Sequence, residues 1–334
     1  MSPALIVKTC GPGTTVQDLG RFGMIASGAS PAGAADADAM YEGAALLGQD
    51  PNAAALELAG LGGTFDVTHP TRIALTGAPA PVRAGEAPLA WNASHLLRPG
   101  ETLTIGASRT GNYSYLHLGG GIDTPLFLGS RATHLVAQIG APVTPGSLAL
   151  GADKGTETDR MLPAPERFGG GTIRIIASAQ TAMFRAEDID RLQATTFARD
   201  PRGNRMGARM GFDGPPFAIE GGLSILSEMV VPGDIQVTGD GTPFVLLNEC
   251  QTTGGYPRIG SVIPPDIPRI AQARAGAPIR FALISRESAL ALHAAHQVHL
   301  RALTPRPRRR DPHDIPDLLS YQLISGAITG DERE

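Results

Sequence analysis

The sequence predicts a mainly β fold that is divided into two domains. Its 334 residues are too many for one typical domain and suit two of ordinary size. Its 42 glycines and 28 prolines, together with only 18% charged residues, are typical of many short strands joined by turns. Short apolar runs bounded by Gly and Pro recur along the chain, so we expect strands to dominate and helices to be few and short.

The overall charge and the cysteine count restrict the class of protein. A formal charge of -4 provides no general attraction for nucleic acid or for an anionic membrane surface, so neither partner is expected. Cys10 and Cys250 are too few for a disulfide framework, and we expect both to be reduced, buried thiols. The sequence shows no basic leader followed by an apolar core, and no run of about eighteen apolar residues. We therefore expect a cytoplasmic protein.

The first predicted strand, around Leu5, runs into a glycine-rich stretch over residues 11–23. The glycines indicate a tightly folded loop, and Gln17, Asp18 and Arg21 could all project to one side of it. Arg21 could clamp a substrate carboxylate through two hydrogen bonds, or it could pair with Asp18 and hold the loop. The sequence leaves both interpretations of Arg21 open.

A helix and a series of short strands follow in the first half. Asp36 is positioned to cap a helix that extends through Leu47 and ends at Gly48. Glu57 lies in a predicted strand between apolar neighbours, and we expect it on a solvated face, which is commoner than a buried acid. Strands are expected at residues 55–58, 64–67, 72–76, 103–105, 113–118 and 148–150.

Three consecutive glycines, Gly119-Gly-Gly121, come directly after one of these strands. A phosphate-binding loop would continue into a helix and carry a lysine, and neither follows here. The sequence therefore identifies no ATP site.

A Pro- and Gly-rich break at residues 153–171 marks the predicted domain boundary. We expect one domain over residues 1–168, a second over 169–302, and a linker with a C-terminal tail over 303–334. In the second domain, strands are expected at 172–177 and 280–284, and helices at 186–193 and 285–302. Arg202, Arg205 and Arg209 lie among glycines on a predicted loop, where they could reach a carboxylate or could equally be solvated.

Three histidines lie in the last predicted helix. No Glu occupies the position that a helical zinc motif requires, and spacings of three drift around the helix surface. We expect these side chains to pack or to face solvent, and we expect no metal site: His293, His296 and His299. Beyond them, residues 318–324 could dock onto the body or onto a partner.

The most informative stretch follows the apolar run Phe244-Val-Leu-Leu247, which predicts a buried strand. Gln251, Thr252 and Thr253 come just after it, and these neutral side chains offer both hydrogen-bond donors and acceptors. Such a set suits an amide, lactam or ureido group better than a phosphate. The alternative is an ordinary hairpin connection whose hydroxyls cap their own backbone.

Seven motifs in order along the chain together resemble one family. They are Thr14-Thr-Val-Gln-Asp-Leu-Gly-Arg21, Ser30-Pro-Ala-Gly33 with Asp36, Gly119-Gly-Gly-Ile-Asp123, Leu128-Gly-Ser-Arg131, Arg205-Met-Gly207, Ser227-Glu228 with Val231-Pro-Gly233, and Gln251-Thr-Thr-Gly-Gly-Tyr-Pro257. The chain resembles, from Leu5 to Phe281, the biotin-dependent carboxyltransferase family long labelled allophanate hydrolase subunit 2, which includes the C-type subunit of 5-oxoprolinase and KipA. This resemblance implies two cyclophilin-like β-barrel domains with a few short helices.

The resemblance also implies partners and an activity. A shorter protein, of the allophanate hydrolase subunit 1 type or the 5-oxoprolinase B type, would form a hetero-oligomer with this chain. With a LamB/YcsF-type subunit, the pair would open 5-oxoproline to glutamate at the expense of ATP. An alternative is transfer of a carboxyl group from carboxybiotin to a urea-like or amide nitrogen. Biotin would then be carried on another chain, because neither lysine, Lys8 or Lys154, stands in a Met-Lys-Met setting. A third possibility is a non-catalytic, KipA-like regulator that binds a kinase inhibitor.

Site roles follow from the same resemblance, for a small lactam or urea-like substrate. Gln251, Thr252 and Thr253, with Gln17, would recognise the substrate, and Arg21 or Arg205 would bind its carboxylate. Tyr256 would form a pocket wall or donate a hydrogen bond. Asp18 and Glu228 are the candidate acid-base groups, although either could simply orient an arginine.

Overall fold

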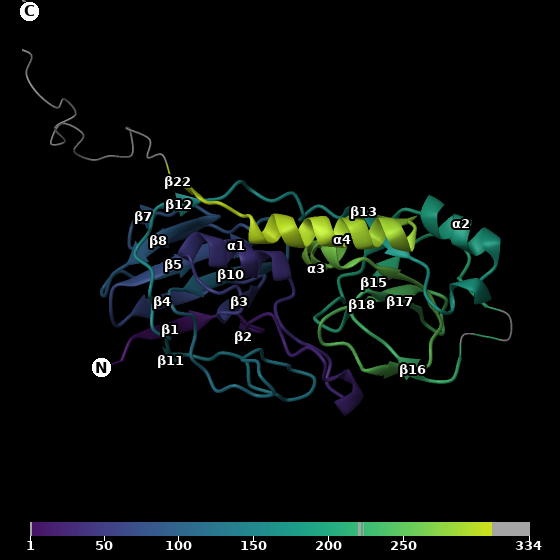
Figure 1. The fold of residues 1–334 in the computed structure, drawn as a ribbon, viewed down its shortest axis with the longest axis horizontal. Coiled ribbons are helices and arrows are strands. Elements are labelled where there is room, and N and C mark those ends of the chain that lie inside the picture. The colour runs from purple at the N-terminus through teal and green to yellow at the C-terminus, as the bar shows by residue number, and fades with distance from the viewer. Residues whose placement is uncertain (1, 220–221, 223, 309–334) are drawn as a thin grey trace, which may run out of the picture.

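The structure is a computed structural model that describes residues 2–219, 222 and 224–308. Figure 1 shows two halves side by side, with the strands that precede residue 162 in one half and those of residues 171–283 in the other. The predicted mainly β fold is confirmed, since strands far outnumber helices in the described ranges. Within those ranges, no helix is both long enough and apolar enough to cross a bilayer.

The first half contains two β-sheets and one α-helix. Its elements are β1 (Ala4–Cys10), β2 (Thr15–Gln17), the short 3-10 helix η1 (Ile25–Ser27), α1 (Ala37–Leu47), β3 (Ala55–Ala59), β4 (Gly63–Val67), β5 (Thr71–Gly77), β6 (Val82–Ala84), β7 (Ala87–Pro88), β8 (Ala93–Leu97), β9 (Leu103–Ile105), β10 (Tyr113–Leu118), β11 (Gly146–Ala149), β12 (Arg160–Met161) and, returning from the end of the described chain, β22 (Arg306–Pro307). One sheet has the order β11-β1-β4-β9-β6-β7 and the other β2-β3-β10-β5-β8-β12-β22.

The two sheets share one apolar cluster. Residues two apart in a strand point to the same face of a sheet, so each strand contributes alternate side chains. Both sheets supply such pairs to the cluster: Leu5 and Val7, Phe65 and Val67, Leu56 and Leu58, Ile73 and Leu75, and Leu116 and Leu118. The first half is therefore built around a core of its own.

Helix α1 packs on the seven-stranded sheet, and its predicted ends are confirmed. The Asp36 carboxylate accepts a hydrogen bond from Ala39 N at 3.2 Å, and Gly48 ends the helix in the left-handed conformation, with φ of 61°. Gly43 lies directly over the ring of His117 in β10, because a Cβ atom there would stand 2.4 Å from the ring. The close approach of helix and sheet therefore depends on a glycine at position 43.

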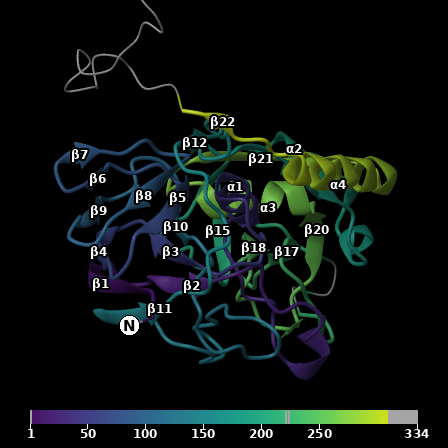
Figure 2. The same cartoon turned by 60° about the vertical axis from the view of Figure 1, so that its left-hand side comes forward.

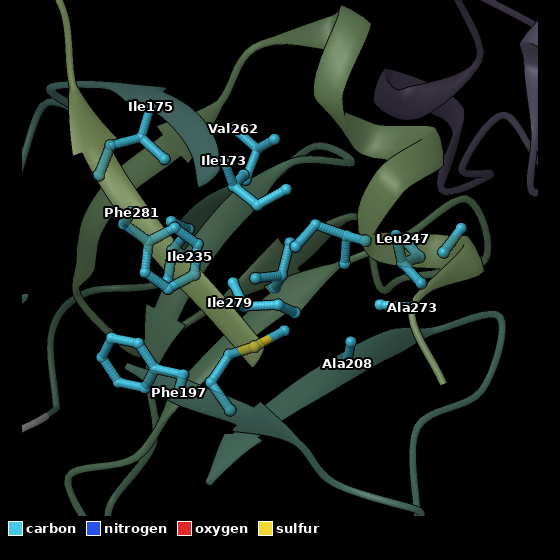
Figure 3. Close-up of a cluster of buried hydrophobic side chains, with 14 of the residues drawn as sticks. Ile173, Ile175, Phe197, Ala208, Ile235, Leu247, Val262, Ala273, Ile279 and Phe281 are labelled. Carbon is cyan, nitrogen blue, oxygen red and sulfur yellow. The ribbon is translucent and has the colours of Figure 1, made fainter. Parts of the chain in front are cut away.

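The second half is a closed barrel. Its elements are β13 (Gly171–Ile176), η2 (Thr181–Met183), α2 (Ala186–Ala194), β14 (Phe197–Arg199), β15 (Gly207–Gly211), β16 (Glu228–Met229), β17 (Asp234–Val237), β18 (Pro243–Leu246), β19 (Thr253–Gly254), β20 (Arg258–Val262), η3 (Pro264–Asp266), α3 (Ile267–Gln272), β21 (Pro278–Leu283) and α4 (Arg286–Arg301). The barrel order is β13-β20-β17-β18-β15-β14-β21, and it closes through a parallel pairing of β13 with β21. Figure 3 shows Ile173, Ile235, Ile279 and Phe281 pointing into its interior, with Phe197 beside them.

The halves meet along a hydrogen-bonded seam. The Asn112 side chain donates to Ala271 O at 2.8 Å and to Ala273 O at 2.7 Å. In the opposite direction, Gln272 of α3 accepts hydrogen bonds from the backbone N–H groups of Asn112 and Tyr113 and donates one to Asp36 Oδ2 at 2.7 Å. The apolar cluster of the barrel also continues into the first half through α1 and β10. The two halves therefore share buried surface as well as polar contacts.

After the barrel, the chain returns to the first half. Helix α4, which Ser285 caps as expected, contacts α1 through a hydrogen bond between His296 Nε2 and Asp38 Oδ1 at 2.9 Å. Strand β22 then pairs with β12, as Figure 2 shows, so the predicted linker over 303–334 begins as part of a sheet. The apolar segment predicted at residues 318–324 lies outside the described residues.

Two local expectations are wrong. Cys250 is buried, but Cys10 at the end of β1 is only half-buried, with its Sγ donating to Val143 O at 3.2 Å. Arg209 lies in strand β15 rather than on a loop, and it pairs with Asp240 at 2.8 Å. Both errors have the same cause: the segment that packs against each residue is distant in sequence, Val143 for Cys10 and strand β18 for Arg209.

Candidate functional site

A cavity of about 740 Å³ lies in the first half, where β2 faces the long connection between β10 and β11. Its lining includes Val16, Arg21 and much of residues 124–148. This connection and the short helix η1 lie along the lower edge of the molecule in Figure 1. We take the cavity as the candidate site because it contains the predicted Arg21 and is large enough for a small molecule.

Arg21 is the most unusual group in the lining. Its side chain is only 2% exposed, and one nitrogen, Nη2, donates to Ala132 O. In the described residues its other nitrogens, Nε and Nη1, have no hydrogen-bond partner. Burial lowers the pKa of Arg21, and the negative charges of Asp18 and Glu249 oppose that effect. Unused donors on a buried cation in the wall of a cavity can bind an anion.

Thr124 provides a further unused polar atom in the cavity lining, whereas Gln17 is fully buried and is not among the lining residues. Gln17 Nε2 donates to Thr15 Oγ1 at 2.9 Å and to Thr133 O at 3.0 Å, whereas its Oε1 has no partner in the described structure. Thr124 lines the cavity, and its buried hydroxyl is likewise unpaired there. Gln17 and Arg21 bind the adjacent carbonyls of residues 133 and 132, so the structure brings these two predicted residues together.

Asp18 organises the loop beside the cavity. Its carboxylate accepts hydrogen bonds from Gly20 N at 2.8 Å, Ser130 Oγ at 2.7 Å and Arg131 N at 2.6 Å. It is 1% exposed, and in the described part of the chain no ion pair joins it to Arg21. These contacts favour a positioning role for Asp18 over acid-base chemistry, and they leave Arg21 without the partner that the sequence offered.

A buried serine, histidine and glutamate lie behind the same loop; Ser30 belongs to one of the family motifs, but no site role was predicted for any of the three. Ser30 Oγ is 2.8 Å from His134 Nε2, and Glu249 Oε2 is 3.8 Å from His134 Nδ1. Ala137 N donates to Nδ1 at 3.2 Å, so the histidine carries its proton on Nε2 and donates to the serine. Burial lowers the pKa of His134. In this tautomer the histidine cannot act as a base toward Ser30.

Arg205 joins the halves instead of lining the cavity. It binds the carboxylates of Glu57 and of Glu249, the latter at 2.5 Å, and donates to Gly33 O at 2.6 Å. Although burial alone would lower it, these two carboxylates raise the pKa of Arg205. With its nitrogens occupied, Arg205 is a weaker candidate than Arg21 for a substrate carboxylate.

The expectation that Glu57 lies on a solvated face is wrong. Its side chain is fully buried and binds Arg205, the Tyr115 hydroxyl at 2.7 Å and Ala35 N at 2.8 Å. A cation and two neutral donors together make burial of this carboxylate possible. Because Arg205 lies in the other half of the molecule, the local sequence carries no sign of it.

The remaining predicted site residues form a separate cluster on the barrel. None of Gln251, Thr252, Thr253, Tyr256 and Glu228 is among the residues that line the cavity. Gln251 Nε2 donates to the side chain of Gln236 at 2.9 Å, and Thr253 lies in β19, paired with β16. Tyr256 is 43% exposed.

Glu228 is held by an arginine for which the sequence predicted no role. Its Oε2 accepts a hydrogen bond from Arg258 Nη2 at 2.6 Å and another from the Gln180 amide. Arg258 also binds Asp234 at 3.2 Å. The geometry supports the alternative in which Glu228 orients an arginine.

The other candidate sites carry no binding geometry. Arg202 pairs with Asp200 at 2.7 Å on the surface. A Cβ atom at Gly119 would stand 2.1 Å from Asp153 Oδ2, so the three glycines allow close packing against an acid and do not fit a phosphate group. Among the residues that the structure describes, no cluster of three or more His, Cys, Asp or Glu could hold a metal ion.

Comparison with known proteins gives consistent matches. Residues 27–283 match the family model described as carboxyltransferase domain, subdomain A and B. The C-type subunit of 5-oxoprolinase from Haemophilus influenzae is 32% identical over 86% of this chain and 93% of its own length. The Escherichia coli protein of the same name is 34% identical over 88% of this chain and 95% of its own length. The solved K. lactis urea amidolyase has a TM-score of 0.81 at 23% identity, covering 93% of this chain and 21% of its own, and so shows a shared fold.

Proposed function

This chain belongs to the carboxyltransferase domain family of subdomains A and B, and from that premise we propose that it is the substrate-holding subunit of an ATP-dependent 5-oxoprolinase. Two relatives named as the C-type subunit of that enzyme, at 32% and 34% identity over most of both chains, support this proposal. Their names also imply further subunits. We propose a B-type 5-oxoprolinase protein and a LamB/YcsF-type subunit as those partners.

The observation that carries the choice of substrate is the guanidinium of Arg21 in the cavity lining, two of whose nitrogens have no hydrogen-bond partner among the described residues. 5-Oxoproline is a five-membered lactam with a carboxylate on the carbon next to its ring N–H. Arg21 Nη1 would donate a charge-assisted hydrogen bond to the carboxylate, and the Thr124 hydroxyl in the cavity lining would accept the ring N–H. Urea has no carboxylate, so an arginine with unused donors in the cavity lining favours 5-oxoproline over urea.

The chemistry requires water and a source of free energy. Water adds to the lactam carbonyl carbon and the C–N bond breaks, which gives the amine and second carboxylate of glutamate. ATP would drive this step, and we assign its binding to another chain or to an interface between chains, because the glycine triplet here packs against Asp153. The role of this chain is to hold and orient the lactam beside that activated centre.

The test is ATP-dependent glutamate formation by this chain mixed with the subunits encoded beside it, compared with the mixture that lacks it. We expect glutamate only when the chain is present. Arg21→Ala should raise KM for 5-oxoproline at least about tenfold, as expected when a charged hydrogen-bond partner is lost. Arg202→Ala is the matched control, since Arg202 is an exposed, paired arginine outside the cavity. An assembled complex that forms no glutamate would overturn the proposal.

The second candidate is carboxyl transfer from carboxybiotin, carried by another chain, to a urea-like or amide nitrogen. The family description and the fold shared with a urea amidolyase favour it. In that case Gln251, Thr252 and Thr253 would contact the uncharged substrate, and Gln251→Ala would abolish turnover while Arg21→Ala would not. Loss of both activities, with partner binding retained, would instead indicate a KipA-like regulator.

A further inference from the structure

We propose that Glu249, which belongs to the second half, is a positioning residue for the cavity in the first half. The inference rests on the proposed function and deepens it. Glu249 lies two residues before Gln251, and the local sequence carries no sign of such a role. Its side chain is 1% exposed and reaches out of the barrel toward the cavity wall.

One carboxylate oxygen of Glu249 holds the cavity wall. Oε2 accepts hydrogen bonds from Leu135 N at 3.1 Å and from Val136 N at 3.4 Å. These residues lie in a turn that is closed by two backbone hydrogen bonds between His134 and Ile139, at 2.8 and 3.1 Å. Since the cavity lining includes residues 137–139 of the same turn, the carboxylate fixes the position of the wall.

The other carboxylate oxygen is anchored in turn. Oε1 accepts a hydrogen bond from Arg205 Nε at 2.5 Å, and Arg205 is tied to Glu57 of β3. The backbone N–H of Glu249 also donates to Arg205 O at 2.9 Å. Glu249 therefore cannot shift without breaking contacts that join the two halves. The position of the cavity wall thus depends on the position of the barrel.

Positioning and simple electrostatics predict opposite results. Glu249 is one of two acids whose charge supports the ionised form of Arg21. If charge were its only contribution, Glu249→Gln would strengthen binding of a carboxylate, because a competing negative charge near Arg21 would be gone. If Glu249 positions the wall, the same substitution weakens binding.

The experiment compares Glu249→Gln with Asp266→Asn in the assembled complex. Asp266 is a matched control, because it is a buried acid of the same half that binds an arginine, Arg174, and that residue's backbone N–H. Both variants should lower the melting temperature. Only Glu249→Gln should raise KM for 5-oxoproline, by about tenfold, with kcat changed less than about threefold. An unchanged or lower KM overturns the inference while leaving the proposed function intact.

A second measurement does not depend on turnover. In the full chain, hydrogen exchange at the amides of Leu135 and Val136 should be at least about tenfold faster in Glu249→Gln than in wild type, and unchanged in Asp266→Asn. If the wild-type complex makes no glutamate, the proposed function fails and exchange alone decides the role of Glu249. Unchanged exchange in Glu249→Gln would overturn the inference whatever the activity.

Discussion

Glu57→Gln should lower the free energy of unfolding by about 3 kcal/mol. The carboxylate of Glu57 is fully buried and pairs with Arg205, which is itself 7% exposed. Loss of one member of a buried pair costs about 3–5 kcal/mol, because the remaining charge is left without compensation. The lower end applies here, since Arg205 keeps its contact with Glu249 at 2.5 Å.

Urea unfolding of the purified chain at pH 7 provides the measurement, with the midpoint and slope compared between variants. Tyr115→Phe keeps the ion pair with Arg205 but removes a hydroxyl that donates to Glu57 and accepts from Asp36 N at 2.8 Å. It should cost about 2 kcal/mol, because a buried N–H loses its acceptor as well. Glu86→Gln in the exposed pair with Arg83 should have no measurable effect. A cost below about 1 kcal/mol for Glu57→Gln would refute the reasoning.

Further predictions concern packing, pH and the seam between the halves. Gly43→Ala should cost about 1–3 kcal/mol by thermal unfolding, although alanine favours helices, because its Cβ would stand 2.4 Å from the ring of His117. An unchanged melting temperature would show that the helix can move away. Burial lowers the pKa of His117 from 6.5 to about 3, so between these pH values the histidine is protonated in the unfolded chain and neutral in the folded chain. This contribution to the free energy of unfolding is complete above pH 6.5 and is lost as pH falls, by about 2 kcal/mol at pH 5. His117→Gln should therefore flatten the plot of unfolding free energy against pH between pH 6.5 and 4. An unaltered slope of that plot would contradict the prediction. Asn112→Ala should cost about 2–3 kcal/mol in urea, because the carbonyls of Ala271 and Ala273 lose their donor; Asn52→Ala, on the surface, is the control.

Local signals were sufficient for the elements but not for the contacts between them. The helix that Asp36 caps and Gly48 ends was predictable at both ends, because capping depends on residues within one turn. Glu57 was not, since its partner Arg205 is 148 residues away. The pattern of a strand shows that one of its faces is buried. It cannot show that a charged side chain from a distant part of the sequence packs against that face.

The candidate site was predictable in part for the same reason. Gln17 ends strand β2 and Arg21 follows four residues later, so their proximity could be predicted from the sequence, whereas only Arg21 lines the cavity. Gln251 was expected to join them and instead binds Gln236 on the barrel. Glu249 lies beside Gln251 in sequence and received no predicted role, because its partners Leu135 and Val136 belong to the other half. Motif order along a chain does not fix which motifs meet.

The pairing of β12 with β22 makes the barrel an insertion. Strand β12 precedes the barrel in the sequence and β22 follows it. The two strands are neighbours in one sheet, with Arg160 opposite Pro307 and Met161 opposite Arg306. Entry and exit points this close are the arrangement in which one domain can be spliced into another without disturbing the host's topology. The first half is thus interrupted by the barrel, and the inserted barrel contributes Glu249 to the wall of a cavity that the first half encloses.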